Sequence, residues 1–161
     1  MADKRNYWLV KSEPDVFSID DLIAAPGKRT CWDGVRNYTA RNMMRDDLKK
    51  GDGVLYYHSR MDPPGVAGIA EVVREGYADH TQFDPANSHF DAKADPENPR
   101  WFMVDIRAVE KFDCHVPLAD LKASKKLADM AVVQRGQRLS VQRVTAAEWR
   151  EVLRMGKSKK R

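Results

Sequence analysis

Short apolar runs alternate with polar, glycine-rich or proline-rich segments along most of the chain. Residues 7–10 form an aromatic and aliphatic run that predicts a buried strand. Residues 53–58 and 66–74 also have strand-like patterns, and the proline- and glycine-containing segment 61–65 between them is typical of a turn. Residues 101–109 alternate between apolar and polar side chains. The pattern therefore predicts several strands, two of which form a hairpin.

Helical patterns lie between these strands. Ser18 is followed three positions later by Asp21, which predicts the capped start of a short helix that ends by Pro26. Residues 38–50 place their apolar side chains on one face of a helix, and Gly51 is a suitable helix stop. We therefore expect two helices before the hairpin.

The C-terminal third predicts further helices. Residues 117–122 and 127–133 each match a short helix. Thr145 and Glu148 form a capping box at the start of a last helix that turns Trp149 inward.

Residues 77–100 are rich in aspartate and proline and have little periodicity, so they predict a long irregular connection of the kind that often carries function. Strands separated by short helices, without regular βαβ alternation, favour an α+β class and a compact β-barrel with short peripheral helices. The length of 161 residues fits one domain. We expect a single domain over residues 1–156 and a basic tail over residues 157–161.

The composition is that of a folded protein, with 42% hydrophobic and 32% charged residues. Apolar runs are too short to cross a membrane, and the N-terminus lacks the apolar core of a signal peptide. Cys31 and Cys114 lie far apart and form neither a disulfide framework nor a zinc set. We therefore expect both thiols to be reduced, in a cytoplasmic protein that does not bind membranes.

Positive charge is concentrated near the C-terminus. The formal net charge is +4, but residues 133–161 contain nine Lys and Arg residues against two acidic residues. A concentrated basic surface is typical of proteins that bind polyanions, although a solvated basic tail that aids solubility has the same composition.

Sequence patterns of common enzymes are absent. There is no Gly-x-Ser-x-Gly motif, no phosphate-binding glycine loop and no His-Glu-x-x-His motif, and the four histidines lack metal-ligand spacing. His58 and Ser59 resemble a base and a nucleophile oriented by Asp33, but neighbouring residues on a strand point to opposite faces. We therefore predict no catalytic residue, no metal and no cofactor.

One segment combines the groups that hold a flat heterocycle. Residues 32–38 contain a tryptophan, a glycine, hydrogen-bonding side chains and an arginine. Recognition of a nucleobase requires a stacking surface, worth about 1–3 kcal/mol per base, together with polar groups that read the edge of the base. Alternatively, Trp32 is a core residue and Arg36 a surface ion-pair partner; the residue types leave both interpretations open.

Short sequence motifs that follow one another in a fixed order resemble those of a known family over most of the chain. They comprise residues 8–14, 32–38, 40–42, 51–52, 57–59, 66–70, 101, 104–105, 138–142 and 149. Through these motifs the sequence resembles the EVE domain family of the PUA-like superfamily across about residues 6–155. The resemblance implies a PUA-like β-barrel with short peripheral helices and a pocket that recognises a modified base.

The family also implies roles for particular residues. EVE domains are similar to YTH domains, which enclose N6-methyladenine in an aromatic cage, and they are associated with 5-methyl- and 5-hydroxymethylcytosine in DNA. Lys11 and Ser12 resemble the Lys-Ser pair at the YTH pocket, and Trp32 resembles a cage tryptophan. The candidates for a second cage aromatic lie in the 77–100 connection and are Tyr77, Phe83 and Phe90.

We therefore predict a non-catalytic, monomeric domain that binds DNA or RNA through a modified base, either flipped out or in a single strand. The expected base-binding pocket comprises Lys11, Ser12, Glu13, Trp32, Asp33, Val35, Arg36, Asn37, Tyr57, His58 and Ser59. The residues expected to contact the nucleic-acid backbone are Arg41, Lys157, Lys159, Lys160 and Arg161. Two alternatives use the same pocket: a hydrolase or nuclease of the related ASCH type, and a small-molecule sensor.

Overall fold

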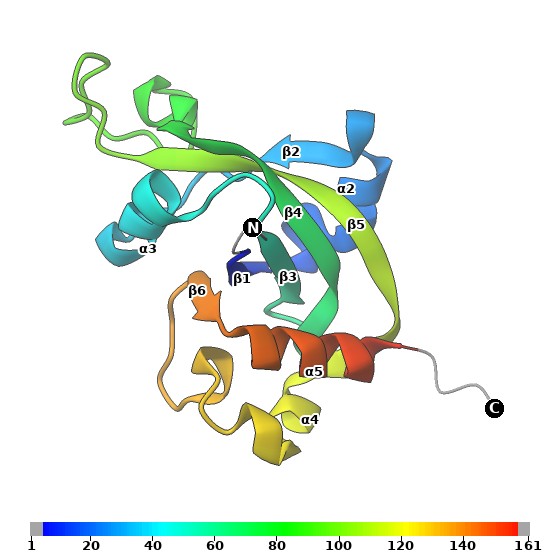
Figure 1. Cartoon of the computed structure of the whole chain (residues 1–161). Coiled ribbons are helices and arrows are strands. Elements are labelled where there is room, and N and C mark those ends of the chain that lie inside the picture. Colours follow the sequence, from blue (N-terminus) through cyan, green and yellow to red (C-terminus); the bar gives the residue numbers. More distant parts are fainter. Residues whose placement is uncertain (1–4, 158–161) are drawn as a thin grey trace.

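The computed structural model describes residues 5–157, which form a six-stranded mixed sheet with short helices on both of its faces (Figure 1). The strands are β1 (Tyr7–Ser12), β2 (Arg29–Cys31), β3 (Gly53–His58), β4 (Gly65–Ala78), β5 (Phe102–Pro117) and β6 (Val141–Val144). Their order is β2-β5-β4-β3-β1-β6; β1 and β3 are parallel, and all other neighbouring pairs are antiparallel. The α+β class is confirmed. The predicted closed barrel is not confirmed, because β2 and β6 are the two edges of this sheet.

The helices are short apart from the last one. They are α1 (Pro14–Phe17), α2 (Ile19–Ala24), α3 (Tyr38–Asn42), α4 (Leu118–Ala123) and α5 (Ala146–Gly156). Single turns complete the connections: η1 (Pro26–Lys28), η2 (Met43–Asp47), η3 (His80–Phe83), η4 (Lys125–Leu127) and η5 (Ala131–Val133). Most of the chain outside the sheet therefore consists of loops and turns that are placed by packing against the strands.

Both faces of the central strands are buried, and each face has its own core. Trp8 and Val10 of β1 pack with Tyr56 under α2 and α3, whereas Leu9 packs with Tyr57 under α4 and α5. Figure 1 shows β1 and β3 lying between these two groups of helices. Alternate side chains of a strand point to opposite faces, so a continuous apolar run supplies two cores.

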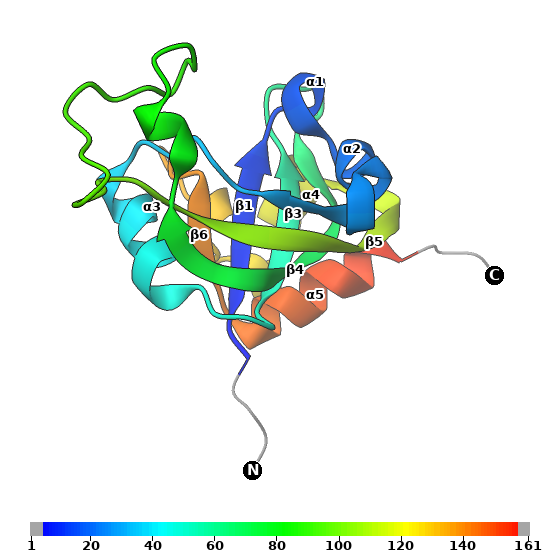
Figure 2. The same cartoon turned by 90° about the horizontal axis from the view of Figure 1, so that it is seen from above.

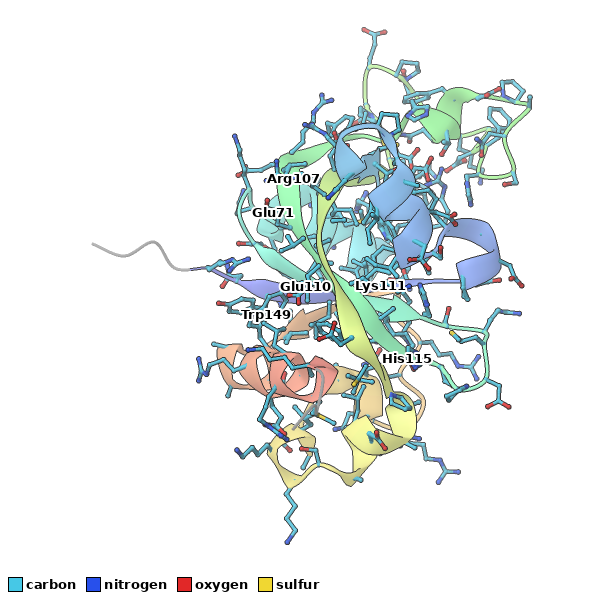
Figure 3. The ribbon with its side chains drawn as sticks, turned by 90° about the vertical axis from the view of Figure 1, so that its right-hand side faces the viewer. Glu71, Arg107, Glu110, Lys111, His115 and Trp149 are labelled. Carbon is cyan, nitrogen blue, oxygen red and sulfur yellow. The ribbon has the colours of Figure 1, made fainter. Side chains whose placement is uncertain are left out.

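The long strands β4 and β5 contribute side chains to both cores. Their pairing has register shifts at several points, and such bulges increase the twist and bend a strand. Figure 3 follows β5 from Arg107, which forms an ion pair with Glu71 of β4, past Lys111 to His115 beside α4. The far end of β4 leads into η3 and the connection to β5, which therefore lies at the opposite end of the sheet from α4 (Figure 1).

The sequence pattern predicted most elements but not their lengths. The hairpin and both capping boxes, at Ser18 and Thr145, are confirmed. The predicted helix over 127–133 is wrong, because the chain forms the two single turns η4 and η5 there. The short edge strands β2 and β6 were not predicted, since three or four residues are too few to show a periodicity.

A buried carboxylate ties the start of β1 to the start of β3. Asp52 is 3% exposed and accepts hydrogen bonds from the Trp8 indole nitrogen at 2.9 Å, the Lys49 backbone nitrogen at 2.9 Å and the Asn6 backbone nitrogen at 3.2 Å. A buried donor that loses its acceptor destabilises the folded state by the full free-energy cost of its desolvation. Asp52 therefore fixes the turn that precedes β3.

We predict that Asp52→Ala lowers the free energy of unfolding by about 3 kcal/mol, because the Trp8 indole and two backbone amides lose their acceptor. Urea denaturation measures the change. Asp129→Ala, at an exposed position, is the matched control and should change stability by less than about 0.5 kcal/mol. Equal effects of the two substitutions would contradict this role of Asp52.

Candidate functional site

A cavity of about 490 Å³ lies at the C-terminal end of β1, beside α1. Its lining consists of residues 11–13, 16–17 and 30–36, together with His89 and Ser140. Figure 2 shows β1 ending next to α1, with the segment after β2 crossing in front. The volume is within the range of small-ligand sites. Seven of the eleven residues predicted for the pocket line this cavity: Lys11, Ser12, Glu13, Trp32, Asp33, Val35 and Arg36.

Trp32 belongs both to the core and to the cavity. Its side chain is 9% exposed and meets the Tyr56 ring edge to face, with ring centroids 5.4 Å apart. Its backbone nitrogen donates to the Val104 carbonyl at 2.7 Å, which holds it against β5. The core interpretation and the pocket interpretation of Trp32 are therefore compatible, and the indole is a rigid wall.

Hydroxyl groups fix the inner end of the cavity. Ser12 Oγ and the Tyr56 phenol both donate to the Phe17 carbonyl, each at 2.7 Å. Burial raises the pKa of Tyr56, so the phenol stays protonated. Since the Ser12 hydroxyl proton is used inside the protein, its oxygen offers lone pairs as acceptors to a ligand.

Arg36 is a structural clamp whose five N–H donors are all used. Its guanidinium donates to the carboxylate of Asp79 at 3.0 Å and to the Thr81 hydroxyl at 3.0 Å. Two further N–H groups donate to the His89 carbonyl at 3.1 and 2.8 Å, and one donates to the Val35 carbonyl at 3.1 Å. Arg36 therefore ties the segment after β2 to the segment after β4 and has no donor left for a phosphate.

Asp79 anchors this clamp from inside the protein. Burial by itself raises the pKa of the Asp79 carboxyl, but hydrogen bonds from Thr81, from the Gly34 backbone nitrogen at 2.7 Å and from Arg36 outweigh it and hold the pKa below its ordinary value. The side chain is fully buried. An ionised carboxylate surrounded by donors is the stable state of such a site.

His89 closes the cavity from the long connection. Gly34 has φ +81°, and a Cβ atom there would lie 2.7 Å from Cε1 of the His89 ring. Glycine therefore allows the imidazole to lie against the backbone. Sequence reasoning expected Tyr77, Phe83 or Phe90 from this connection, but none of them lines the cavity. No local signal marked His89, since its position depends on the clamp at Arg36.

Two other residues predicted for the pocket, Tyr57 and His58, do not line this cavity. The pleat of β3 places Tyr57 on the opposite face of the sheet, so Tyr56 shares the face of Trp32. His58 is buried, and its Nε2 atom accepts a hydrogen bond from the Ile19 backbone nitrogen at 3.1 Å. The expectation that Tyr57 and His58 line the cavity of Trp32 is therefore wrong.

The remaining predicted residues lie around the site. Asn37 caps α3, with its side-chain oxygen accepting from the Ala40 nitrogen at 3.1 Å, and Ser59 contacts the site through its backbone nitrogen, which donates to the Ser12 carbonyl at 2.9 Å. Arg41 packs over the Tyr38 ring. Among the predicted tail residues, Lys157 is the last described residue; Lys159, Lys160 and Arg161 lie outside the described residues.

The described residues show neither a metal site nor a membrane span. Within residues 5–157, no group of three or more histidine, cysteine or acidic side chains is arranged to hold a metal ion. In the same range no helix has the length and apolar character needed to cross a bilayer. Cys31, which lines the cavity, and Cys114 are both free thiols.

Comparison with known proteins places the chain in a family. The sequence model of the EVE domain matches residues 6–155. Human thymocyte nuclear protein 1 is 42% identical over 92% of this chain and 72% of its own length. The crystal structure of human THYN1 in complex with DNA containing 5-methylcytosine has a TM-score of 0.89 and 41% identity, with 96% of this chain and 99% of that one covered.

Two further solved structures agree in fold. A hypothetical protein from Leishmania major has a TM-score of 0.89 and 48% identity, with 97% of both chains covered. An ASCH protein from Zymomonas mobilis, 9% identical, covers 94% of this chain and 99% of its own with a TM-score of 0.55, which shows the fold alone. The fold is thus of the PUA-like and ASCH type. The human relative is named a nuclear protein, so the cytoplasmic location stays a prediction.

The clamp predicts a coupled effect on stability. Arg36→Gln leaves the buried Asp79 carboxylate without its cation, which should lower the free energy of unfolding by about 3–5 kcal/mol. Arg36→Gln combined with Asp79→Asn removes the charge as well, so its loss should be well below the sum of the two single losses. Urea denaturation of the three variants measures this coupling, and additive losses would contradict it.

Buried histidine predicts a pH dependence. Burial, followed by the nearby His115, lowers the pKa of His58 below its ordinary value of 6.5. The folded state therefore binds its proton less readily than the unfolded chain, so stability is greatest above about pH 6.5 and falls as the pH drops toward the folded pKa. His58→Gln should remove part of this fall, measured by urea denaturation at about pH 7.5 and about pH 5.5. An unchanged pH dependence would assign the effect to other groups.

Proposed function

Since this chain belongs to the EVE domain family, we propose that it is a non-catalytic reader of DNA that carries 5-methylcytosine or a similarly modified cytosine. The cavity at Trp32 is the observation that carries the proposal, because it offers a rigid indole wall and a polar rim at one place. The human relative crystallised with DNA containing 5-methylcytosine supports this choice of ligand. The modified base enters the cavity after it has been turned out of the helix.

The lining suits the chemistry of a cytosine. Trp32, Val35 and Phe17 provide apolar surface for the ring and for a methyl group at its 5 position. Glu13 and Asp33 line the same cavity, and a carboxylate accepts from the exocyclic amino group of cytosine. The indole wall supplies affinity for any base, and the carboxylates supply the preference for cytosine over thymine.

Two polar groups next to the cavity, His58 and Tyr56, are engaged in hydrogen bonds inside the protein. His58 Nε2 accepts a hydrogen bond from a backbone nitrogen. The Tyr56 phenol donates to a backbone carbonyl, and burial raises the pKa of the phenol. Neither group is poised as a general base near the cavity. Incubation with modified DNA and a divalent metal ion should leave the DNA uncut; cleavage would favour the hydrolase or nuclease alternative.

We predict that Trp32→Leu weakens binding to DNA with 5-methylcytosine by roughly ten- to a hundredfold, because stacking contributes about 1–3 kcal/mol per base. Fluorescence anisotropy with a labelled duplex measures the change, with unmodified DNA and an RNA of the same sequence in parallel. Equal affinity for modified and unmodified DNA in the parent protein would overturn the proposed function.

Trp149→Leu is the matched control for loss of a buried indole. Trp149 is 6% exposed, stacks on Tyr7 in the core on the opposite face, and does not line the Trp32 cavity. This variant should lose stability but keep its affinity and its preference for the modified base. If both variants lost binding equally, the effect of Trp32→Leu would be one of folding, and the pocket assignment would fall.

A further inference from the structure

A second and larger cavity, of about 770 Å³, lies on the other face of the sheet. Its lining consists of Lys11, Tyr57, Leu118, Lys122, Ala128, residues 132–134, Arg135, Gly136 and Gln137. It therefore lies between the end of β1, helix α4 and the segment that leads from η5 toward β6. Helix α4 and the segment after η5 lie in the lower part of the molecule in Figure 1.

Lys11 joins this second cavity to the cavity of Trp32. It lines both. Its backbone nitrogen donates to the carbonyl of Ser140, which lines the first cavity, at 2.9 Å, and its ammonium donates to the carbonyl of Gln137, which lines the second, at 3.4 Å. The segment 137–140 is thus a shared wall, and a chain molecule that leaves one cavity across this wall enters the other.

All the charged residues that line the second cavity are cationic. Three cations line it, Lys11, Lys122 and Arg135, and no aspartate or glutamate does. Within residues 5–157, no carboxylate forms an ion pair with Lys122 or Arg135 to neutralise its charge.

Other arginines of the basic C-terminal segment are already paired. Arg143 binds Asp47 at 2.7 Å, and Arg154 binds Glu151. Within the basic segment 133–161, the fold therefore uses Arg143 and Arg154 in ion pairs and places Arg135 in the lining of an open cavity. Concentrated unpaired positive charge attracts a polyanion.

We propose that the second cavity binds the phosphates next to the recognised base, so that the DNA strand crosses the segment 137–140 and continues past Arg135 and Lys122. This proposal rests on the proposed function, because the base in the Trp32 cavity sets where the strand begins. Phosphate contacts fix the register of the strand and carry no sequence information. The two cavities together separate recognition of the base from attachment of the strand.

The test removes two charges from the second cavity and leaves Lys11 in place. Lys122→Gln combined with Arg135→Gln is titrated by fluorescence anisotropy with a duplex that contains one 5-methylcytosine, between about 50 and about 200 mM salt. The slope of log K against log salt should become shallower by about 1.8, which corresponds to two lost phosphate contacts. Affinity at the lowest salt should fall at least about tenfold, with the preference for the modified base unchanged.

Lys125→Gln combined with Arg150→Gln is the matched control. Both side chains are exposed, line neither cavity and have no ion pair among the described residues, so the variant loses the same charge elsewhere. Its salt slope should remain that of the parent. An equal slope change in both variants, or none in Lys122→Gln/Arg135→Gln, would overturn the phosphate site.

The two proposals fail in different measurements. A parent protein that binds modified and unmodified DNA equally would refute the recognition of the base, whatever the salt slopes are. A variant Lys122→Gln/Arg135→Gln that keeps the parent slope but loses the preference for the modified base would instead place these residues in base recognition and refute the phosphate site.

Discussion

The pleat of β1 is the constraint on which the rest of the site depends. β1 is paired on both sides, with β3 and β6, and its side chains alternate between two buried cores. The same alternation continues at its last two residues. Lys11 lies with Tyr57 on the face of α4, whereas Ser12 bonds to Phe17 on the face of Trp32. A shift of one residue in the register would exchange the two faces and dismantle both cavities.

The walls of the Trp32 cavity come from segments far apart in sequence, and a single guanidinium joins two of them, residues 30–36 and the segment that carries His89. Arg36 binds Asp79 and the His89 carbonyl, and Asp79 accepts from the Gly34 backbone. This part of the cavity is thus held by a guanidinium whose donors are all used, which fixes the wall before any ligand arrives. Such preorganisation reduces the ordering cost of binding a base.

Charge has different roles in different parts of the molecule. The clamp uses an arginine to hold loops together, and pairs such as Arg143 with Asp47 attach edge elements to one another. Lys122 and Arg135 remain facing a cavity. A net charge calculated from the sequence counts all of these arginines and lysines alike, whereas only the unpaired ones generate the field that a polyanion meets.

The sequence by itself determined the local elements and the family. Apolar runs, caps and turns predicted the hairpin, the helix starts at Ser18 and Thr145, and the segment around Trp32, because these signals act over a few neighbouring residues. Only the tertiary structure decided that Tyr57 lies away from Trp32, that Arg36 is a clamp and that His89 closes the cavity. These outcomes depend on strand register and on contacts more than forty residues apart, as in the 53-residue separation of Arg36 and His89. Local patterns carry no record of such contacts, since they arise when packing brings distant segments together.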